Sequence, residues 1–159
     1  MNSSTIGAGG GIIGKVISNP IEFGHPVDVV FGTKALSRRQ QNILDKLPDY
    51  GSRAVVKKKD VSMLDLSALT AKTGNEFAMF TCERERLVIR DDIETVPIRS
   101  DDAIKLREAG YRWSGHTHVG ITNADLVASK GDIEILEAFK QENSVIYNSL
   151  GMHKKIKEE

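Results

Sequence analysis

The chain has 159 residues, of which 40% are hydrophobic and 28% are charged, a balance that fits one globular domain and excludes a disordered or fibrous protein. The 22 basic and 22 acidic residues cancel, which argues against a general nucleic-acid coat but not against a local basic patch. Cys82 is the only cysteine, so no intramolecular disulfide can form. With neither an apolar run of ~20 residues nor a signal-peptide pattern, the sequence predicts a cytoplasmic protein without a membrane partner.

The N-terminal segment, residues 1–24, is rich in glycine, serine and asparagine, and we expect a flexible linker there. A single folded domain is expected over residues 25–157. Ser37 can cap a first helix that ends before Pro48. The apolar face of this helix is expected to carry Ile43, Leu44 and Leu47.

The next elements are a strand over residues 54–57 and a helix that starts at residue 63 and is ended by Gly74. The apolar stripe of this helix is expected to comprise Met63, Leu64, Ala68 and Leu69. Three strands are then predicted, over residues 76–81, 86–90 and 95–98. The polar sequence between the first two is typical of a hairpin turn.

The C-terminal half alternates in the same way. A helix opened by Asp101 and Asp102 should bury Ile104 and Leu106, and Gly110 closes it. A strand over residues 112–118, an irregular segment over 121–128, a helix capped by Ser129, a strand over 144–147 and a short basic segment complete the chain. The helix after Ser129 should bury Ile133, Ile135, Leu136, Ala138 and Phe139. This alternation predicts an α/β fold with one mixed sheet flanked by helices.

The most informative motif is Trp-Ser-Gly-His-Thr-His, residues 113–118. Residues two apart on a strand point to the same face, so His116 and His118 should lie side by side. Two imidazoles in that arrangement can supply two nitrogen ligands to a divalent metal such as zinc. Histidines on strands are also often merely hydrogen-bonded, so the pair alone leaves both interpretations open.

A third ligand is available in Asp132, which follows Ser129 by three residues. The pair also fits a helix capping box, which is the commoner reason for this spacing. Together, His116, His118 and Asp132 would leave a fourth zinc position open for water. Glu76, which opens an otherwise apolar strand, is the best candidate for the base that accepts the proton of that water. Glu83 and Glu85 compete for this role, but their alternation with arginines is typical of an exposed hairpin.

The order of Glu76, His-Thr-His and Ser-x-x-Asp resembles that of the JAMM metalloproteases, also called JAB or MPN+ domains. The resemblance covers residues 54–147 and implies a JAB/MPN-like fold, related to the deaminase-like sandwich. It implies that His116, His118 and Asp132 bind Zn²⁺. It also implies that Glu76 is the general base and acid, and that Ser129 stabilises the tetrahedral intermediate. The implied activity is hydrolysis of peptide or isopeptide bonds in a protein substrate.

Two features depart from the family pattern. Val119 stands where the family usually has proline, and residues 119–128 form a loop of ten residues where the family has about seven. Neither departure removes a ligand, but the loop bears on substrate specificity. Upstream, residues 24–34 are similar to the segment that precedes effector domains in bacterial polymorphic toxins. That similarity implies a part of a larger exported effector or phage-like protein, with an immunity protein as partner and a structural role for His25.

Two other functions stay open from the residues alone. A metal-free nuclease could use His116 and His118 as acid and base, with Arg38, Arg39 and residues 57–59 holding phosphate. A non-catalytic binding domain could keep the same fold. A zinc deaminase is excluded, because its Cys-x-x-Cys ligands need more than one cysteine.

Overall fold

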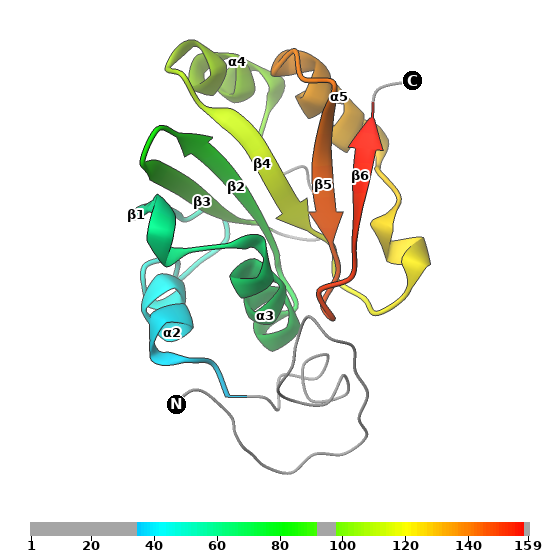
Figure 1. Ribbon diagram of the computed structural model, residues 1–159. Helices are drawn as coiled ribbons and strands as arrows, with labels where there is room; N and C mark the ends of the chain where they lie inside the picture. Colours follow the sequence, from blue (N-terminus) through cyan, green and yellow to red (C-terminus); the bar gives the residue numbers. More distant parts are fainter. Residues whose placement is uncertain (1–34, 92–97, 158–159) are drawn as a thin grey trace.

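The computed structural model describes residues 35–91 and 98–157, and in these residues a six-stranded sheet lies between two layers of helices (Figure 1). The strand order is β1-β3-β2-β4-β5-β6. The strands are β1 (Arg53–Lys57), β2 (Glu76–Cys82), β3 (Glu85–Asp91), β4 (Arg112–Thr117), β5 (Asn143–Tyr147) and β6 (His153–Lys157). The helices are α2 (Arg38–Asp45), α3 (Met63–Thr73), α4 (Ser100–Glu108) and α5 (Lys130–Ala138), with the short 3₁₀ helices η1 (Lys58–Asp60) and η2 (Asn123–Leu126).

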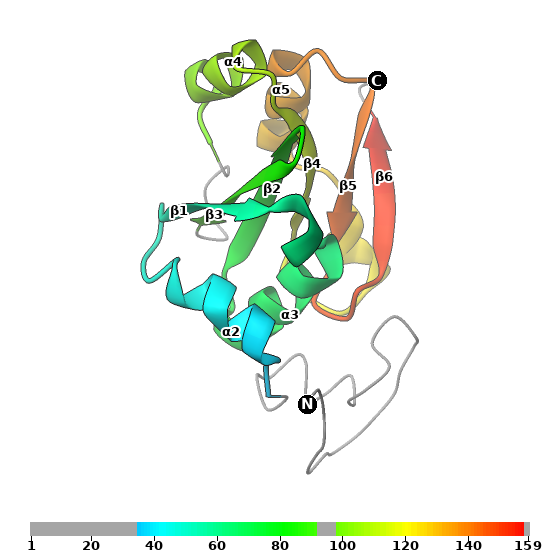
Figure 2. The same cartoon turned by 60° about the vertical axis from the view of Figure 1, so that its left-hand side comes forward.

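Each face of the sheet has its own apolar core, and the alternation along β2 explains why. Figure 2 shows α2 and α3 on one face of the sheet and α4 and α5 on the other. Phe77 and Met79 belong to the core on the α2 and α3 face, whereas Ala78 and Phe80 belong to the core on the α4 and α5 face. The first core also contains Leu47, Leu66, Leu69 and Val88. The second contains Trp113, Ile135, Leu136, Phe139 and Ile146. The two cores make this a three-layer α/β/α arrangement.

The direction of the strands brings three termini together at one end of the sheet. β4 and β5 are parallel and are joined through η2 and α5, whereas all other neighbouring strands are antiparallel. The ends of β4 and β5 therefore lie beside the start of β2 (Figure 1). The chain leaves β4 at this end and enters α5, so side chains from β2, β4 and the first turn of α5 can meet here.

A β-bulge in β4 sets which side chains face the α4 and α5 layer. Phe80 pairs with Trp113 and Met79 pairs with Gly115, so Ser114 is the additional residue in the ladder. Trp113 and His116 therefore lie on the same face although they are three residues apart. Gly115 is closely packed, because a Cβ there would lie 2.9 Å from the Val145 carbonyl oxygen and 3.0 Å from Met63 Sδ.

The predicted α/β class and the mixed sheet are confirmed, as are the helices capped by Ser37 and Ser129. Gly74 ends α3 in the left-handed conformation, with φ of 76°. The prediction of a mere basic segment at the C-terminus was wrong, because that segment forms the edge strand β6. The linker over residues 1–24, the start of the domain at residue 25 and most of the strand predicted over 95–98 lie outside the described residues.

Two predicted core positions were also wrong. Leu64 is 40% exposed and Ile104 is 39% exposed. In α3 the buried stripe runs instead through Met63, Leu66 and Leu69, which are three residues apart and contact the sheet. In α4 only Ala103 is fully buried, with Leu106 packed beside it. Among the described residues, the helices are all too short or too polar to cross a membrane.

Candidate metal centre

The two histidines at the end of β4 lie on the same face of the sheet, as their spacing predicts. The Nε2 atoms of His116 and His118 are 3.1 Å apart, and the rings meet edge to face at 75°. His116 is completely buried, whereas His118 is partly exposed beyond the last residue of β4. The backbone N–H of His118 donates to the Tyr147 carbonyl at 2.9 Å, which extends the pairing with β5 to this residue.

Asp132 completes the cluster from the first turn of α5. Its Oδ1 lies 3.0 Å from His116 Nε2, and its Oδ2 lies 3.2 Å from His118 Nε2. Asp132 occupies the same helical stripe as Ile135, Leu136 and Phe139, so the carboxylate points into the protein rather than into solvent. The charged position in an otherwise buried stripe is a signal that the sequence itself carries.

The capping box predicted for Ser129 and Asp132 is present together with the cluster. The Asp132 N–H donates to Ser129 Oγ at 3.0 Å, and the Ser129 N–H donates to Asp132 Oδ2 at 2.9 Å. The same carboxylate thus closes the helix end and faces both histidines. The capping contacts fix the carboxylate, because both of them are made within one turn of a helix whose start is defined by Ser129.

The orientation of His118 depends on a group that the sequence does not reveal. His118 Nδ1 lies 2.8 Å from the backbone carbonyl oxygen of Asp125, in η2. A carbonyl only accepts, so Nδ1 is the donor in this contact, and in the neutral ring the lone pair lies on Nε2, where a ligand would replace the proton shared with Asp132. Asp125 acts through its backbone, and its side chain instead caps η2 through Thr122. No side-chain pattern could have predicted this contact.

His116 is held by packing rather than by a second hydrogen bond. Its ring stacks on Trp113 with centroids 4.9 Å apart and planes 28° from parallel. His116 Nδ1 is buried and has no hydrogen-bond partner among the described residues. Trp113 is therefore both a core residue and the support of a candidate ligand.

The three groups perturb one another electrostatically. Burial lowers the pKa of His116, and its hydrogen bond with Asp132 opposes this shift without reversing it. Burial also acts to lower the pKa of His118, but the hydrogen bond with Asp132 and the charges of Glu76 and Asp132 outweigh it and raise that pKa. For Asp132, burial acts to raise the pKa, but the hydrogen bonds with both histidines hold the pKa well below its usual range. The cluster therefore contains a carboxylate anion at neutral pH.

The geometry fits a divalent metal ion. The ligand atoms of His116, His118 and Asp132 all lie within 4.8 Å of one another, which defines a group that could hold an ion. Ligands bound tetrahedrally at 2.0–2.2 Å from zinc lie about 3.3–3.6 Å apart. The two Nε2 atoms, 3.1 Å apart, lie just below that range, and the carboxylate contacts His116 through Oδ1 at 3.0 Å and His118 through Oδ2 at 3.2 Å. Two imidazole nitrogens and one carboxylate oxygen are also a donor set that zinc accepts.

Glu76 lies next to this cluster, as the strand register requires. Ala78 pairs with His116, so in an antiparallel ladder the residue two positions before Ala78 faces His118. The register is fixed there, because the Phe77 N–H donates to Thr117 Oγ1 at 2.9 Å. In keeping with this register, the charge of Glu76 acts to raise the pKa of His118.

The competing candidates for the base lie elsewhere. Glu83 is in the turn after β2 and Glu85 is at the start of β3, paired with Cys82. β2 has seven residues, so the hairpin turn is about 20 Å from Glu76. Cys82 also lies at that end, where its Sγ is 3.7 Å from the Ala109 carbonyl oxygen. The structure therefore brings Glu76 to the histidines and keeps Glu83, Glu85 and Cys82 away from them.

The basic residues considered for phosphate binding lie at the opposite edge of the sheet. Residues 57–59 belong to the end of β1 and to η1, and β3 and β2 separate this edge from β4. Arg39, in α2, pairs with the buried carboxylate of Asp65. None of these positions adjoins the histidines, which lie under α5 on the other face.

In comparisons with known proteins, no protein-family model, no curated protein and no solved structure matches this chain.

Proposed function

We propose that this protein is a zinc-dependent hydrolase that cleaves peptide or isopeptide bonds in a protein substrate. The observation that carries the proposal is the convergence of His116, His118 and Asp132, three ligand atoms from two rigid elements with a carboxylate beside them. An N₂O donor set with one open position is typical of catalytic zinc sites. His118 is already held in the tautomer that a ligand needs.

The chain's own residues can divide the work of hydrolysis. A bound zinc ion would lower the pKa of a water molecule to about 7 and polarise the scissile carbonyl. Glu76, beside His118, would accept a proton from the attacking water and deliver it to the leaving amine. Ser129 is exposed and its oxygen accepts from Asp132, so its hydroxyl hydrogen is free to donate to the developing oxyanion.

These roles are the ones that the resemblance to the JAMM metalloproteases implies. That resemblance is carried by Glu76, the His-Thr-His motif and the Ser-x-x-Asp motif of residues 129–132. The resemblance supplies the choice of peptide or isopeptide bonds as substrates and of a JAB/MPN-like fold. The similarity of residues 24–34 to polymorphic toxins adds the proposal that the domain is the effector of an exported bacterial protein with an immunity protein as partner. Residues 24–34 lie outside the described residues, so this part rests on sequence alone.

Metal content and cleavage measured on the same preparations test the proposal. We expect the wild-type protein to hold about one equivalent of zinc by elemental analysis. We expect it to cleave members of a library of linear and isopeptide-branched peptides, detected by mass spectrometry as newly released amines. His116→Ala should abolish both zinc binding and cleavage. His153→Ala is the matched control, because His153, in β6, stacks on Tyr147 of β5 and is not a member of the cluster.

The opposing results are distinct. Zinc binding that is unchanged in His116→Ala would contradict the metal centre. Zinc binding without cleavage of any library member, before or after reconstitution, would favour the non-catalytic binding domain. Phosphodiesterase activity that resists a chelator and needs both histidines would instead support the metal-free nuclease.

A further inference from the structure

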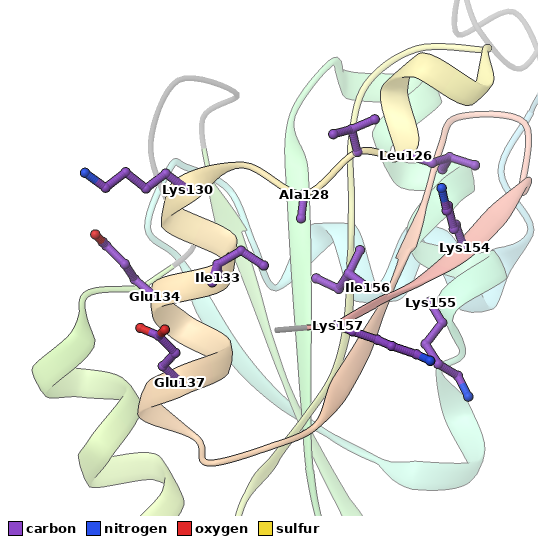
Figure 3. A pocket seen from close by; sticks show the side chains of 11 residues that line it. Leu126, Ala128, Lys130, Ile133, Glu134, Glu137, Lys154, Lys155, Ile156 and Lys157 are labelled. Atoms are coloured by element: carbon purple, nitrogen blue, oxygen red, sulfur yellow. The ribbon is translucent and has the colours of Figure 1, made fainter. Parts of the chain in front are cut away.

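The outer edge of the sheet beside α5 is bordered by a groove that the candidate metal centre does not use. β6 is the last strand in the sheet, and among the described residues no strand pairs with its outer edge. The groove has a volume of about 820 Å³ and lies between β6, α5 and the segment that joins η2 to α5 (Figure 3). Its apolar lining consists of Leu126, Val127, Ala128, Ile133 and Ile156.

The groove follows the edge of β6 rather than one of its faces. Consecutive residues of a strand point to opposite faces, yet all four residues from Lys154 to Lys157 line the groove. A surface that touches all four must therefore run along the backbone of the strand. In an antiparallel pair, alternate residues direct their N–H and C=O groups away from the partner, so β6 offers a row of these groups to the groove.

The side chains around this edge differ between the two faces. Ile156 belongs to the core under α5, and Ile133 points from α5 toward it (Figure 3). Lys155 and Lys157 alternate with Ile156 and therefore lie on the opposite face. From α5, Lys130, Glu134 and Glu137 also line the groove (Figure 3), so its charged lining consists of four lysines and two glutamates and is cationic on balance. One face of the edge thus carries Ile156 together with Lys154, and the other face carries Lys155 and Lys157.

We propose that this groove binds an extended polypeptide segment, in which apolar residues alternate with acidic residues, as an additional strand of the sheet. The backbone of the segment would pair with β6. Its apolar side chains would enter the groove beside Ile133 and Val127, which is 63% exposed, and its carboxylates would lie against Lys155 and Lys157. Lysines on edge strands commonly prevent pairing with other strands. Here they would admit an acidic strand and repel a basic one.

The groove is continuous with the candidate metal centre through the chain. Leu126 and Ala128 line it, and they lie between Asp125, whose carbonyl holds His118, and Ser129, which caps the helix of Asp132. We assign the bound segment to the protein substrate. This assignment rests on the proposed hydrolase function, whereas the binding itself does not.

The experiment uses a fluorescent peptide of alternating valine and glutamate, as long as β6, with a valine–lysine peptide as the charge control. Binding is measured by fluorescence anisotropy, and protection of the β6 amides by hydrogen exchange, on the full chain with and without a chelator. The valine–glutamate peptide should bind, slow the exchange of the β6 amides and be unaffected by the chelator. The lysine peptide should not bind.

Matched variants distinguish binding at the β6 edge from non-specific peptide binding. Lys155→Glu combined with Lys157→Glu should weaken binding of the acidic peptide by ~10-fold or more and allow the basic peptide to bind. Lys58→Glu combined with Lys59→Glu, at the opposite edge, should change neither. Val127→Asp should weaken binding, whereas Val55→Asp, on the edge strand β1, should not. Equal binding by all four variants, or protection of β1 instead of β6, would overturn the proposal.

A loss of cleavage in His116→Ala with peptide binding intact would leave the groove in place. The converse result is a protein that never binds the acidic peptide and that cleaves its substrates normally after Lys155→Glu combined with Lys157→Glu. That result would contradict peptide binding in the groove and leave the proposed hydrolase function standing.

Discussion

Helices α3 and α5 begin with the same local motif, and the comparison shows what distinguishes a structural carboxylate from a candidate ligand. Both helices have a serine cap followed by an aspartate in a capping box, Ser62 with Asp65 and Ser129 with Asp132. The side chains of Asp65 and Asp132 are 5% and 4% exposed. Within their own helices the two residues are nearly equivalent.

The partners of the two carboxylates differ. Asp65 pairs with Arg39 and accepts a hydrogen bond from Gln40 at 3.1 Å, so a permanent cation neutralises it. Asp132 faces two imidazoles, which can exchange a proton for a metal ion. The capping box is therefore not diagnostic of function. Whether such a carboxylate can bind a metal ion depends on whether the side chains that face it can lose a proton.

The largest expected difference between the two regions is in metal binding. Asp132→Asn removes the charged ligand, so zinc affinity should fall by ~100-fold or more, and cleavage should be lost at limiting zinc. Asp65→Asn should leave zinc affinity unchanged but lower the free energy of unfolding by about 1–3 kcal/mol, because the Arg39 pair is broken. Zinc titration and denaturant unfolding of both variants check this. Equal zinc affinity in the two variants would contradict the assignment of Asp132.

The next effect concerns turnover alone. Glu76→Gln keeps the size of the side chain but removes its ability to accept a proton, so turnover should fall by at least ~100-fold while zinc content stays near that of the wild type. Glu83→Gln and Glu85→Gln are the controls, because both lie at the far end of β2. The assay is the rate of cleavage at saturating substrate. Full activity of Glu76→Gln would exclude it as the base.

A smaller effect should separate the two serine caps. Ser129→Ala and Ser62→Ala each remove one cap and should each lower the free energy of unfolding by about 1 kcal/mol. Only Ser129→Ala should reduce turnover, by about 10- to 100-fold, through loss of the hydrogen bond to the oxyanion. Unfolding curves and cleavage rates of the pair provide the measurement. If both variants lost the same activity, the role of Ser129 would be that of a cap alone.

The smallest effect is on the pH dependence of stability in chelated protein. The pKa of His118 is raised, so its contribution is fully present below the unfolded pKa of about 6.5 and is lost as the pH rises through the folded pKa. The pKa of His116 is lowered, so its contribution falls as the pH drops below about 6.5. Melting temperatures of His118→Gln and His116→Gln across pH 5–8 should therefore differ from the wild type with opposite pH trends. The same trend in both would contradict the two shifts.

Much of the fold was readable because its elements carry strong local signals. Ser37, Ser129 and Gly74 mark helix ends through hydrogen bonds and backbone angles that depend only on neighbouring residues. β6 was missed because Ile156 is its only buried residue, and a strand that pairs on one side needs little apolar surface. The wrong placement of Leu64 and Ile104 shows that the stripe on a short helix depends on where the sheet lies.

The candidate site was readable to the extent that side chains build it. The spacing of His116 and His118 and the position of Asp132 three residues after Ser129, in the first turn of the following helix, predicted the cluster that they form. The Asp125 carbonyl and the stacking of Trp113 on His116 were not predictable. The first is a backbone group and the second depends on the bulge, so neither follows from residue type.

The bulge in β4 has a consequence for how this sequence can vary. Trp113 lies on the face of His116 only because Ser114 adds one residue to the ladder. Deleting one residue here would restore the regular pleat and turn either the aromatic support or both histidines to the opposite face. Substitutions in this strand would change single contacts, whereas a change in its length would dismantle the whole constellation. Over residues 113–118, the site therefore depends on the number of residues in the strand as strongly as on their identity.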